Sequence, residues 1–377
     1  MIAYTALLFY GILTLWITDR WAWSLFQTGI FALTVWRGVR PSVALIPLGA
    51  AIAIPLVQFA LGTTVSPGAT LNAAFDWLTF AFVFALGCEV LAAPDDRERF
   101  LRAVAVIGAA LALVFVAQQY TAHGKVFWLF TSGFEEGVVG PFVNRNQFAA
   151  WIELLLPIAL YTRLGPASAV LFLAAAASSS RAGFGLASVE AVVIIAILTR
   201  RPRLVLATTT IAVVIGSVAL HSRFSGTEML RSEAVRASLE MIRDCPWTGF
   251  GVGTWSLIYP RYASFDPGVF FNQAHNDWLQ WTAEGGLPLL LAMGAFTAML
   301  WRRAVPSIYG LGTVAFLLHA LVDFPMQQRP ALAAWFFAIA AAAWSYSPDG
   351  KPRLLRGRRP SARHRAAVED GPRVLLE

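Results

Sequence analysis

Long apolar runs recur along the whole chain and constrain its fold more than any other feature. Each run is long enough, at about seventeen residues or more, to cross the hydrocarbon of a bilayer as a helix. Only 14% of the residues are charged and 57% are hydrophobic, whereas soluble domains carry about 25% charged residues. The sequence therefore predicts an all-α polytopic membrane protein.

Twelve segments are predicted to cross the membrane within a single transmembrane domain, residues 1–347. They are roughly 2–18, 21–37, 42–61, 73–92, 101–118, 146–162, 166–179, 182–199, 203–220, 277–301, 306–322 and 330–347. The short seventh segment fits either a tilted span or a partly re-entrant one. The first lacks a basic region and a clear cleavage site, so it is interpreted as a span and not a signal peptide.

The placement of lysine and arginine predicts a cytoplasmic N-terminus. In that orientation 19 of the 29 basic residues face the cytoplasm, many of them in the tail 348–377. The long polar segments 119–145 and 221–276 then lie on the periplasmic face. We interpret the tail as an anchor for anionic lipid headgroups. The net charge of +7 mostly reflects this tail, so no nucleic-acid partner is expected.

The periplasmic loop 221–276 is predicted to contain an amphipathic helix. Ser225 and Glu228 have the spacing of a capping box, apolar residues follow at helical spacing, and Asp244 marks the end. The apolar face is expected to lie on the membrane or on the bundle. Arg236 and Arg243 are interpreted first as partners in surface ion pairs along the solvated face.

The motif GFGVGTW (residues 249–255) follows this helix. Its three alternating glycines predict either a tight backbone turn or a close approach to a ligand. It does not join a strand to a helix, so it is not a dinucleotide-binding loop. Arg261, between Tyr259 and Tyr262, is either a ligand contact or a packing cation.

The stretch NQAHNDW (residues 272–278) places polar residues at the mouth of a span. Polar groups near hydrocarbon are costly, which makes them candidates for function. His275 has an ordinary pKa of about 6.5 and could act as a general base; the alternative is a helix-capping histidine. Asn276 or Asp277 could cap the helix instead, and Asn276 could orient His275. Glu284 and the glycines after it either line a cavity or kink the helix.

Four segments in this order resemble one family. They are GPFVNRNQFAAWIELLLP, SSSRAG, LRSEAVRASLEMIRDCPWTGFGVGTW and HNDWLQWTAEGGLP. Together they resemble the O-antigen ligase/polymerase family of bacterial inner-membrane glycosyltransferases, over residues of about 130–300. The segment HALVDFPMQQRP (319–330) resembles the end of the domain in members that polymerise exopolysaccharide.

The resemblance implies a helical C-type glycosyltransferase. The donor would be a glycan on undecaprenyl diphosphate and the acceptor a hydroxyl on the periplasmic side. Neither a nucleotide sugar nor a metal or other cofactor is expected. The acceptor could be a second lipid-linked glycan, a sugar of the lipid A core, or a protein. The 319–330 segment favours polymerisation.

The resemblance also assigns catalytic residues. His275 matches the family's essential histidine, Arg181 the arginine at a helix mouth, and Arg231 the loop arginine. The family commonly has tryptophan where this chain has Val235, so Arg236 is an alternative to Arg231.

The residue chemistry adds candidates for substrate binding, because arginine forks suit phosphate oxygens. For Arg145 and Arg181 the alternative is snorkelling to the interface. The full substrate-binding set is Arg145, Asn146, Arg236, Arg261, Asn276 and Glu284.

Other sites and classes are less well supported. No D-x-D pair occurs, and His275 with Asp277 is too few ligands for a metal. His319 and Asp323 are expected to pair inside the bundle, with a role in the cavity left open. A flippase of lipid-linked glycans is the alternative function, but it predicts internal repeats, and none is recognisable. A structural scaffold would not need His275.

Overall fold

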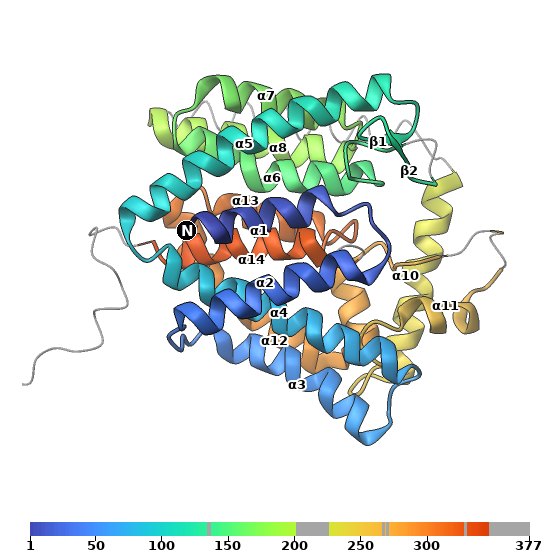
Figure 1. The fold of residues 1–377 in the computed structure, drawn as a ribbon. Helices are drawn as coiled ribbons and strands as arrows, with labels where there is room; N and C mark the ends of the chain where they lie inside the picture. The colour runs from blue at the N-terminus through green and yellow to red at the C-terminus, as the bar shows by residue number, and fades with distance from the viewer. Residues whose placement is uncertain (134–136, 201–225, 266–267, 269–270, 328–329, 347–377) are drawn as a thin grey trace, which may run out of the picture.

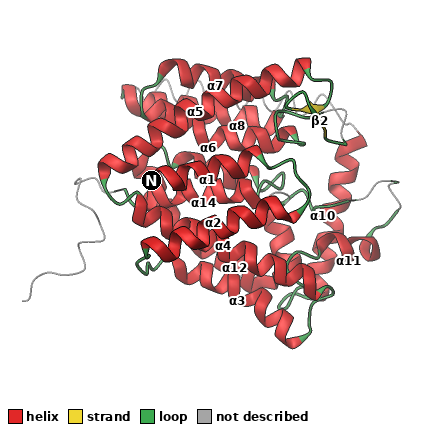
Figure 2. Ribbon diagram, viewed as in Figure 1, coloured by secondary structure: helices red, strands yellow, loops and turns green. Residues whose placement is uncertain are grey.

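The computed structural model describes residues 1–133, 137–200, 226–265, 268, 271–327 and 330–346. The predicted span 203–220, the expected cap residue Ser225 and the basic tail lie outside the described residues. The described chain is almost entirely helical, with loops gathered mainly at the ends of the helices (Figure 2).

The first half contains α1 (Ile2–Leu13), α2 (Arg20–Arg37), α3 (Leu45–Leu61), α4 (Pro67–Val90), α5 (Pro94–Thr121), a hairpin of β1 (Lys125–Val126) and β2 (Phe130–Thr131), and α6 (Arg145–Tyr161). The second half contains α7 (Gly165–Ala177), α8 (Arg181–Thr199), α10 (Gly226–Asp244), α11 (Trp255–Tyr262), α12 (Asp277–Ser307), α13 (Leu311–His319) and α14 (Pro330–Trp344). Every predicted span in the described part overlaps one of these helices.

Four described helices are long and apolar enough to cross a membrane, namely α4, α5, α8 and α12. Four shorter helices, α1, α3, α7 and α14, are also apolar. This composition agrees with a multi-pass membrane protein. The total of twelve crossings stays a prediction.

Helix α14 lies at the centre of the bundle, between α1, α4, α6, α12 and α13 (Figure 1). Every residue from Ala331 to Ala343 is buried. Its many alanines let neighbouring backbones approach closely, as small residues do in membrane bundles. The buried indole of Trp335 donates to the carbonyl oxygen of Leu8, 2.9 Å away.

Helix α10 crosses one end of the bundle, and the β1–β2 hairpin and α11 lie at that same end (Figure 1). The N-terminus lies at the opposite end. The described parts of both long polar segments therefore share one end, as the charge-based orientation requires. The side of the membrane on which this end lies stays a prediction.

The predicted amphipathic helix is confirmed as α10, and only some of its apolar residues are buried. Ala234, Ala237 and Met241 are fully buried, whereas Met229 and Leu239 are more than half exposed. The buried stripe packs in a cluster with Trp255 of α11. The face therefore packs on protein, because small residues allow a closer fit than the bulkier side chains beside them.

The glycine motif forms the predicted tight turn. Gly249, Gly251 and Gly253 have φ values of 61°, 111° and 83°, in the left-handed region that favours glycine. A Cβ on Gly249 would lie 2.2 Å from the carbonyl oxygen of Glu284. The amide of Gly251 donates to that same oxygen at 2.9 Å. The turn thus packs against the backbone of α12.

Candidate active site

Side chains from four segments meet at Asp323, which follows α13 and is only 4% exposed. Asn146 donates a short hydrogen bond from Nδ2 to its Oδ2. The Arg231 Nη2 lies 3.9 Å from Oδ2, and the His275 Nδ1 lies 3.9 Å from Oδ1. We call Asn146, Arg231, His275 and Asp323 the Asp323 cluster.

Helix caps position two members of the cluster. The side chain of Asn144 accepts from the amide of Asn146 at 2.8 Å, which fixes the start of α6. The side chain of Asn276 accepts from the amide of Leu279 at 3.0 Å and caps α12. His275 is therefore not the capping residue.

The start of α12 is also bonded to the turn that carries Asp323. Asn276 Nδ2 donates to the carbonyl oxygen of Leu321 at 2.8 Å. Asp277 accepts from the amide of Met326 at 2.9 Å, and its own amide donates to Ala320. The polar groups of Asn276 are occupied in this way, so Asn276 positions the turn and makes no hydrogen bond with His275.

His275 has an unusual backbone and a partly buried ring. Its φ of 54° is left-handed, a conformation in which histidine is enriched among non-glycine residues. The ring packs edge-on against Phe324, with centroids 4.7 Å apart. Nδ1 is fully buried without a hydrogen bond, while the side chain keeps 27% exposure. The ring is held, yet part of it stays accessible.

Burial lowers the pKa of His275, because it disfavours the charged imidazolium. The Asp323 carboxylate acts in the opposite direction, and the Arg231 guanidinium lowers the pKa further. The imidazole is therefore neutral near pH 7. A neutral imidazole can accept a proton from a hydroxyl group.

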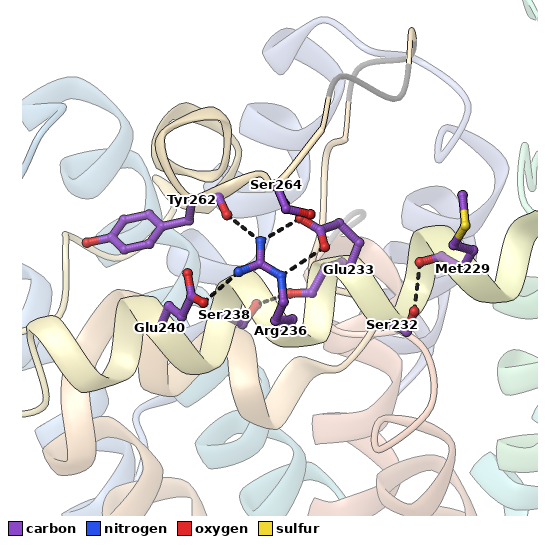
Figure 3. A network of polar contacts seen from close by, with 9 residues as sticks. Met229, Ser232, Glu233, Arg236, Ser238, Glu240, Tyr262 and Ser264 are labelled. Carbon is purple, nitrogen blue, oxygen red and sulfur yellow. Dashed lines mark hydrogen bonds and ion pairs between the residues drawn. The ribbon is translucent and has the colours of Figure 1, made fainter.

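Arg236, five residues after Arg231 on α10, is held by the protein itself (Figure 3). It donates to both carboxylate oxygens of Glu233, to Glu240 and to the carbonyl oxygen of Tyr262, at 2.6–2.9 Å. Glu233 also accepts from the amide of Ser264 at 2.7 Å. These contacts lower the pKa of Glu233 to about 2. We call Glu233, Arg236, Glu240, Tyr262 and Ser264 the Arg236 clasp.

The clasp agrees with the expected surface pairing of Arg236. Arg231, and not Arg236, is the α10 arginine that belongs to the Asp323 cluster. Binding a substrate through Arg236 would require it to exchange bonds that it already makes.

Three other predicted arginines are exposed at helix ends. Arg145 and Arg181 are the first residues of α6 and α8, and Arg261 lies in the last turn of α11. Within the described residues none of their side chains makes a hydrogen bond or an ion pair. Helix N-termini favour anions, so Arg145 and Arg181 suit an anionic ligand.

Glu284 is fully buried and lies outside the cluster. Its Oε1 accepts from the amide of Trp255 at 3.0 Å and from Gln280 at 3.1 Å. The break in α12 comes from Gly286, whose φ of 69° and ψ of −175° are not helical. Glu284 therefore holds the glycine turn, and Gly286 supplies the expected kink.

The expected pairing of His319 with Asp323 is wrong. His319 Nδ1 lies 2.8 Å from Glu153 Oε1, while Asp323 contacts the residues of its own cluster. Helix α13 ends at His319, so the four-residue spacing does not place the two side chains on one helix face. Sequence reasoning left a role of Asp323 in the cavity open but did not include it among the site residues, and its position in the 319–330 segment was the available signal.

An apolar helical bundle with a histidine and arginines at one end defines the class, a polytopic membrane protein with a candidate group-transfer site. Residues 166–294 match the model of the O-antigen ligase family (Wzy_C). The match supports the O-antigen ligase/polymerase family and suggests glycan transfer of that type. The matched region includes Arg181, Arg231 and His275. No curated protein matches the chain.

Proposed function

We propose that the protein transfers a glycan from undecaprenyl diphosphate to an acceptor hydroxyl at the periplasmic face of the bacterial inner membrane. The observation that carries the proposal is the Asp323 cluster, where a neutral histidine and an arginine meet a buried carboxylate at the mouth of α12. A scaffold or a flippase does not require a base in this position.

In the proposed reaction His275 accepts the proton of the acceptor hydroxyl while its oxygen attacks the anomeric carbon of the donor. A new glycosidic bond forms, and the bond between the anomeric carbon and the diphosphate oxygen breaks. The electron pair of that bond stays on the diphosphate. Asp323 faces Nδ1 and stabilises the imidazolium, much as the carboxylate does in a Ser-His-Asp triad.

Arg231 and Arg181 bind the diphosphate and stabilise the negative charge that grows on it as it leaves. Arg145 and Arg261 are further candidates for this binding. The donor bond is already activated by the diphosphate, so we propose that the reaction requires neither nucleotide hydrolysis nor a metal.

The direct test is transfer by purified protein in proteoliposomes that contain a defined undecaprenyl-diphosphate-linked glycan. A second copy of that donor is the first acceptor to supply, because the 319–330 segment resembles polymerising members. Lipid A core and a pilin-type protein are the acceptors to supply next. Mass analysis should detect a glycan one repeat longer or an adduct of one acceptor. Translocation of the donor without any product would replace this proposal with the flippase alternative.

The proposed periplasmic site has a separate test. Reporter fusions after Thr254, in the glycine turn, should be active in the periplasm, and fusions after Arg303, near the other end of α12, should be active in the cytoplasm. The reversed pattern would place the Asp323 cluster on the wrong side for a periplasmic acceptor.

A further inference from the structure

A second polar pair lies in the bundle and has no part in the proposed chemistry. Glu153 of α6 and His319 of α13 are 0% and 1% exposed, and their Oε1 and Nδ1 atoms are 2.8 Å apart. Glu153 Oε2 and His319 Nε2 are also buried, without a hydrogen bond. Ionisable groups within an apolar bundle are costly, so their presence calls for a function.

The pair is bonded directly to the turn that carries Asp323. His319 is the last residue of α13, and its carbonyl oxygen accepts from the amides of Val322 and Asp323, both at 2.9 Å. The imidazole of His319 ties this same residue to α6. Any shift of His319 would therefore move the backbone of Asp323.

Helix α6 holds the turn at a second point. Asn146, which donates to the Asp323 carboxylate, lies seven residues before Glu153 and so shares its helix face. One face of α6 thus fixes both the end of α13 and the carboxylate beyond it. The other charged groups that act on the pair are Asp323 and Arg231, and Glu153 in turn acts on Glu190 of α8.

We propose that Glu153 and His319 are positioning residues that set the Asp323 carboxylate against His275. The catalytic consequence rests on the proposed function, whereas the geometric effect on His275 does not. A role in stability alone explains the pair less well. Replacing both partners of a buried ion pair with apolar residues of similar volume is often neutral or stabilising.

The key variant replaces both partners, Glu153→Leu with His319→Leu. We expect a melting temperature close to that of the wild type and a KM for the donor within about twofold. We expect kcat to fall about 10- to 100-fold, because small misplacements of catalytic groups cost up to about 10² in rate. The exchange variant, Glu153→His with His319→Glu, should recover most of the lost kcat.

Tyr309→Phe is the matched control. It also removes a buried hydrogen bond, from the Tyr309 hydroxyl to the carbonyl oxygen of Ala342. The side-chain hydrogen bond and ring contacts of Tyr309 within the described residues are with Ala342, Tyr161 and Tyr346, and none is with the Asp323 turn. Its kcat should stay close to that of the wild type.

A second readout needs no substrate. The pKa of His275 can be measured by NMR titration of ring-labelled histidines. The chain has only five histidines, and the signal that is lost in His275→Gln belongs to His275. The His275 pKa should fall in the double variant, because the carboxylate that raises it has moved, and should stay unchanged in Tyr309→Phe. If the double variant does not fold, His319→Asn takes its place, and its kcat and its His275 pKa are measured in the same way.

An unchanged His275 titration, or full kcat in the double variant, would show that the pair only packs the bundle. Absence of transfer by the wild-type protein would refute the proposed function instead. In that case the His275 titration still tests whether Glu153 and His319 position Asp323.

Discussion

Two arginines on α10, five residues apart, lie in opposite environments. Arg236 makes four hydrogen bonds at 2.6–2.9 Å, all to groups of the protein. Arg231 has one ion-pair contact, at 3.9 Å, and its side chain is 44% exposed. Two arginine side chains on one helix thus differ in how much of their hydrogen-bonding capacity is used by other groups of the protein.

The difference separates an architectural site from the site that we propose binds the donor. The Arg236 clasp joins α10 to the chain beyond α11, and little of its hydrogen-bonding capacity remains for a ligand. Within the part of the chain that the structure describes, the Asp323 cluster leaves most of the Arg231 donors unused, and the Arg231 side chain is exposed. Unsatisfied polar groups in a native protein call for an explanation, and a ligand that pairs with these Arg231 donors is the one we propose.

The largest effect should come from removing the base. His275→Asn keeps a residue type that tolerates the left-handed φ of 54°, and His275→Ala removes the ring as well. Both should fold and bind donor, yet lose about 10²–10⁴ of the transfer rate. Single-turnover transfer and donor binding on detergent-purified variants would measure this. Near wild-type transfer by a well-folded variant would remove histidine from the mechanism.

Arg231→Ala and Arg181→Ala should each weaken donor binding about 10- to 100-fold, because a hydrogen bond between charged groups is lost. Lysine at either position should rescue only partly, since it lacks the planar fork. Equilibrium binding of a lipid diphosphate is the measurement, with Arg243→Ala as a control on the same helix as Arg231. Equal losses in all three alanine variants would point to a general charge effect.

Arg236→Ala should act mainly on stability. Loss of Arg236 leaves Glu233 with only the amide of Ser264 as a donor and the carbonyl oxygen of Tyr262 without its Arg236 donor, so the melting temperature should fall by about 2–4 °C. Arg231→Ala should leave the melting temperature unchanged, which makes it the matched control. The comparison between the two arginines fails if Arg236→Ala is fully stable and Arg231→Ala is not.

The acid limb of the pH profile should lie below the ordinary histidine pKa of about 6.5. Burial lowers the pKa of His275, so the neutral base persists to lower pH and activity is lost only as the pH falls through this lowered value. Arg231→Ala removes a group that lowers the pKa and should move the limb upward. Asp323→Asn should move it downward. The measurement is kcat/KM against pH for the wild type, Arg231→Ala and Asp323→Asn. Acid limbs at the same pH in all three proteins would contradict the assignment of this limb to His275.

The smallest effect should come from chelation. Transfer in the presence of EDTA should stay close to the untreated rate, because the arginines are proposed to stabilise the leaving diphosphate. Loss of activity that Mg²⁺ or Mn²⁺ restores would assign that role to a metal.

Local patterns predicted much of the fold. The apolar runs predicted the described helices other than α10 and α11, the helical spacing of apolar residues in the loop predicted α10, and the alternating glycines predicted a tight turn. Each of these signals depends on neighbours in the sequence. His275 was also a candidate from local reasoning, as a histidine just before a long apolar helix.

The contacts at Asp323 could not be predicted in this way. Asn146 lies 177 residues before Asp323, so only tertiary packing brings them together. The spacing of His319 and Asp323 suggested a helical pair, but α13 ends at His319. The role of Glu284 was open for a similar reason, since helical periodicity does not reveal that a glycine turn packs against that face.

The length of α12 has a consequence for the height of the site. Its 31 residues would extend over about 46 Å at 1.5 Å per residue, whereas a bilayer is about 40–45 Å thick with its headgroups. The 21 residues after Gly286 alone match the hydrocarbon, at about 31 Å. We propose that these 21 residues cross the hydrocarbon, in place of the predicted span 277–301, and that the first ten residues act as a spacer that would raise His275 into the headgroup layer. Bilayer thickness would thus change the distance between the reacting sugar and the hydrocarbon core.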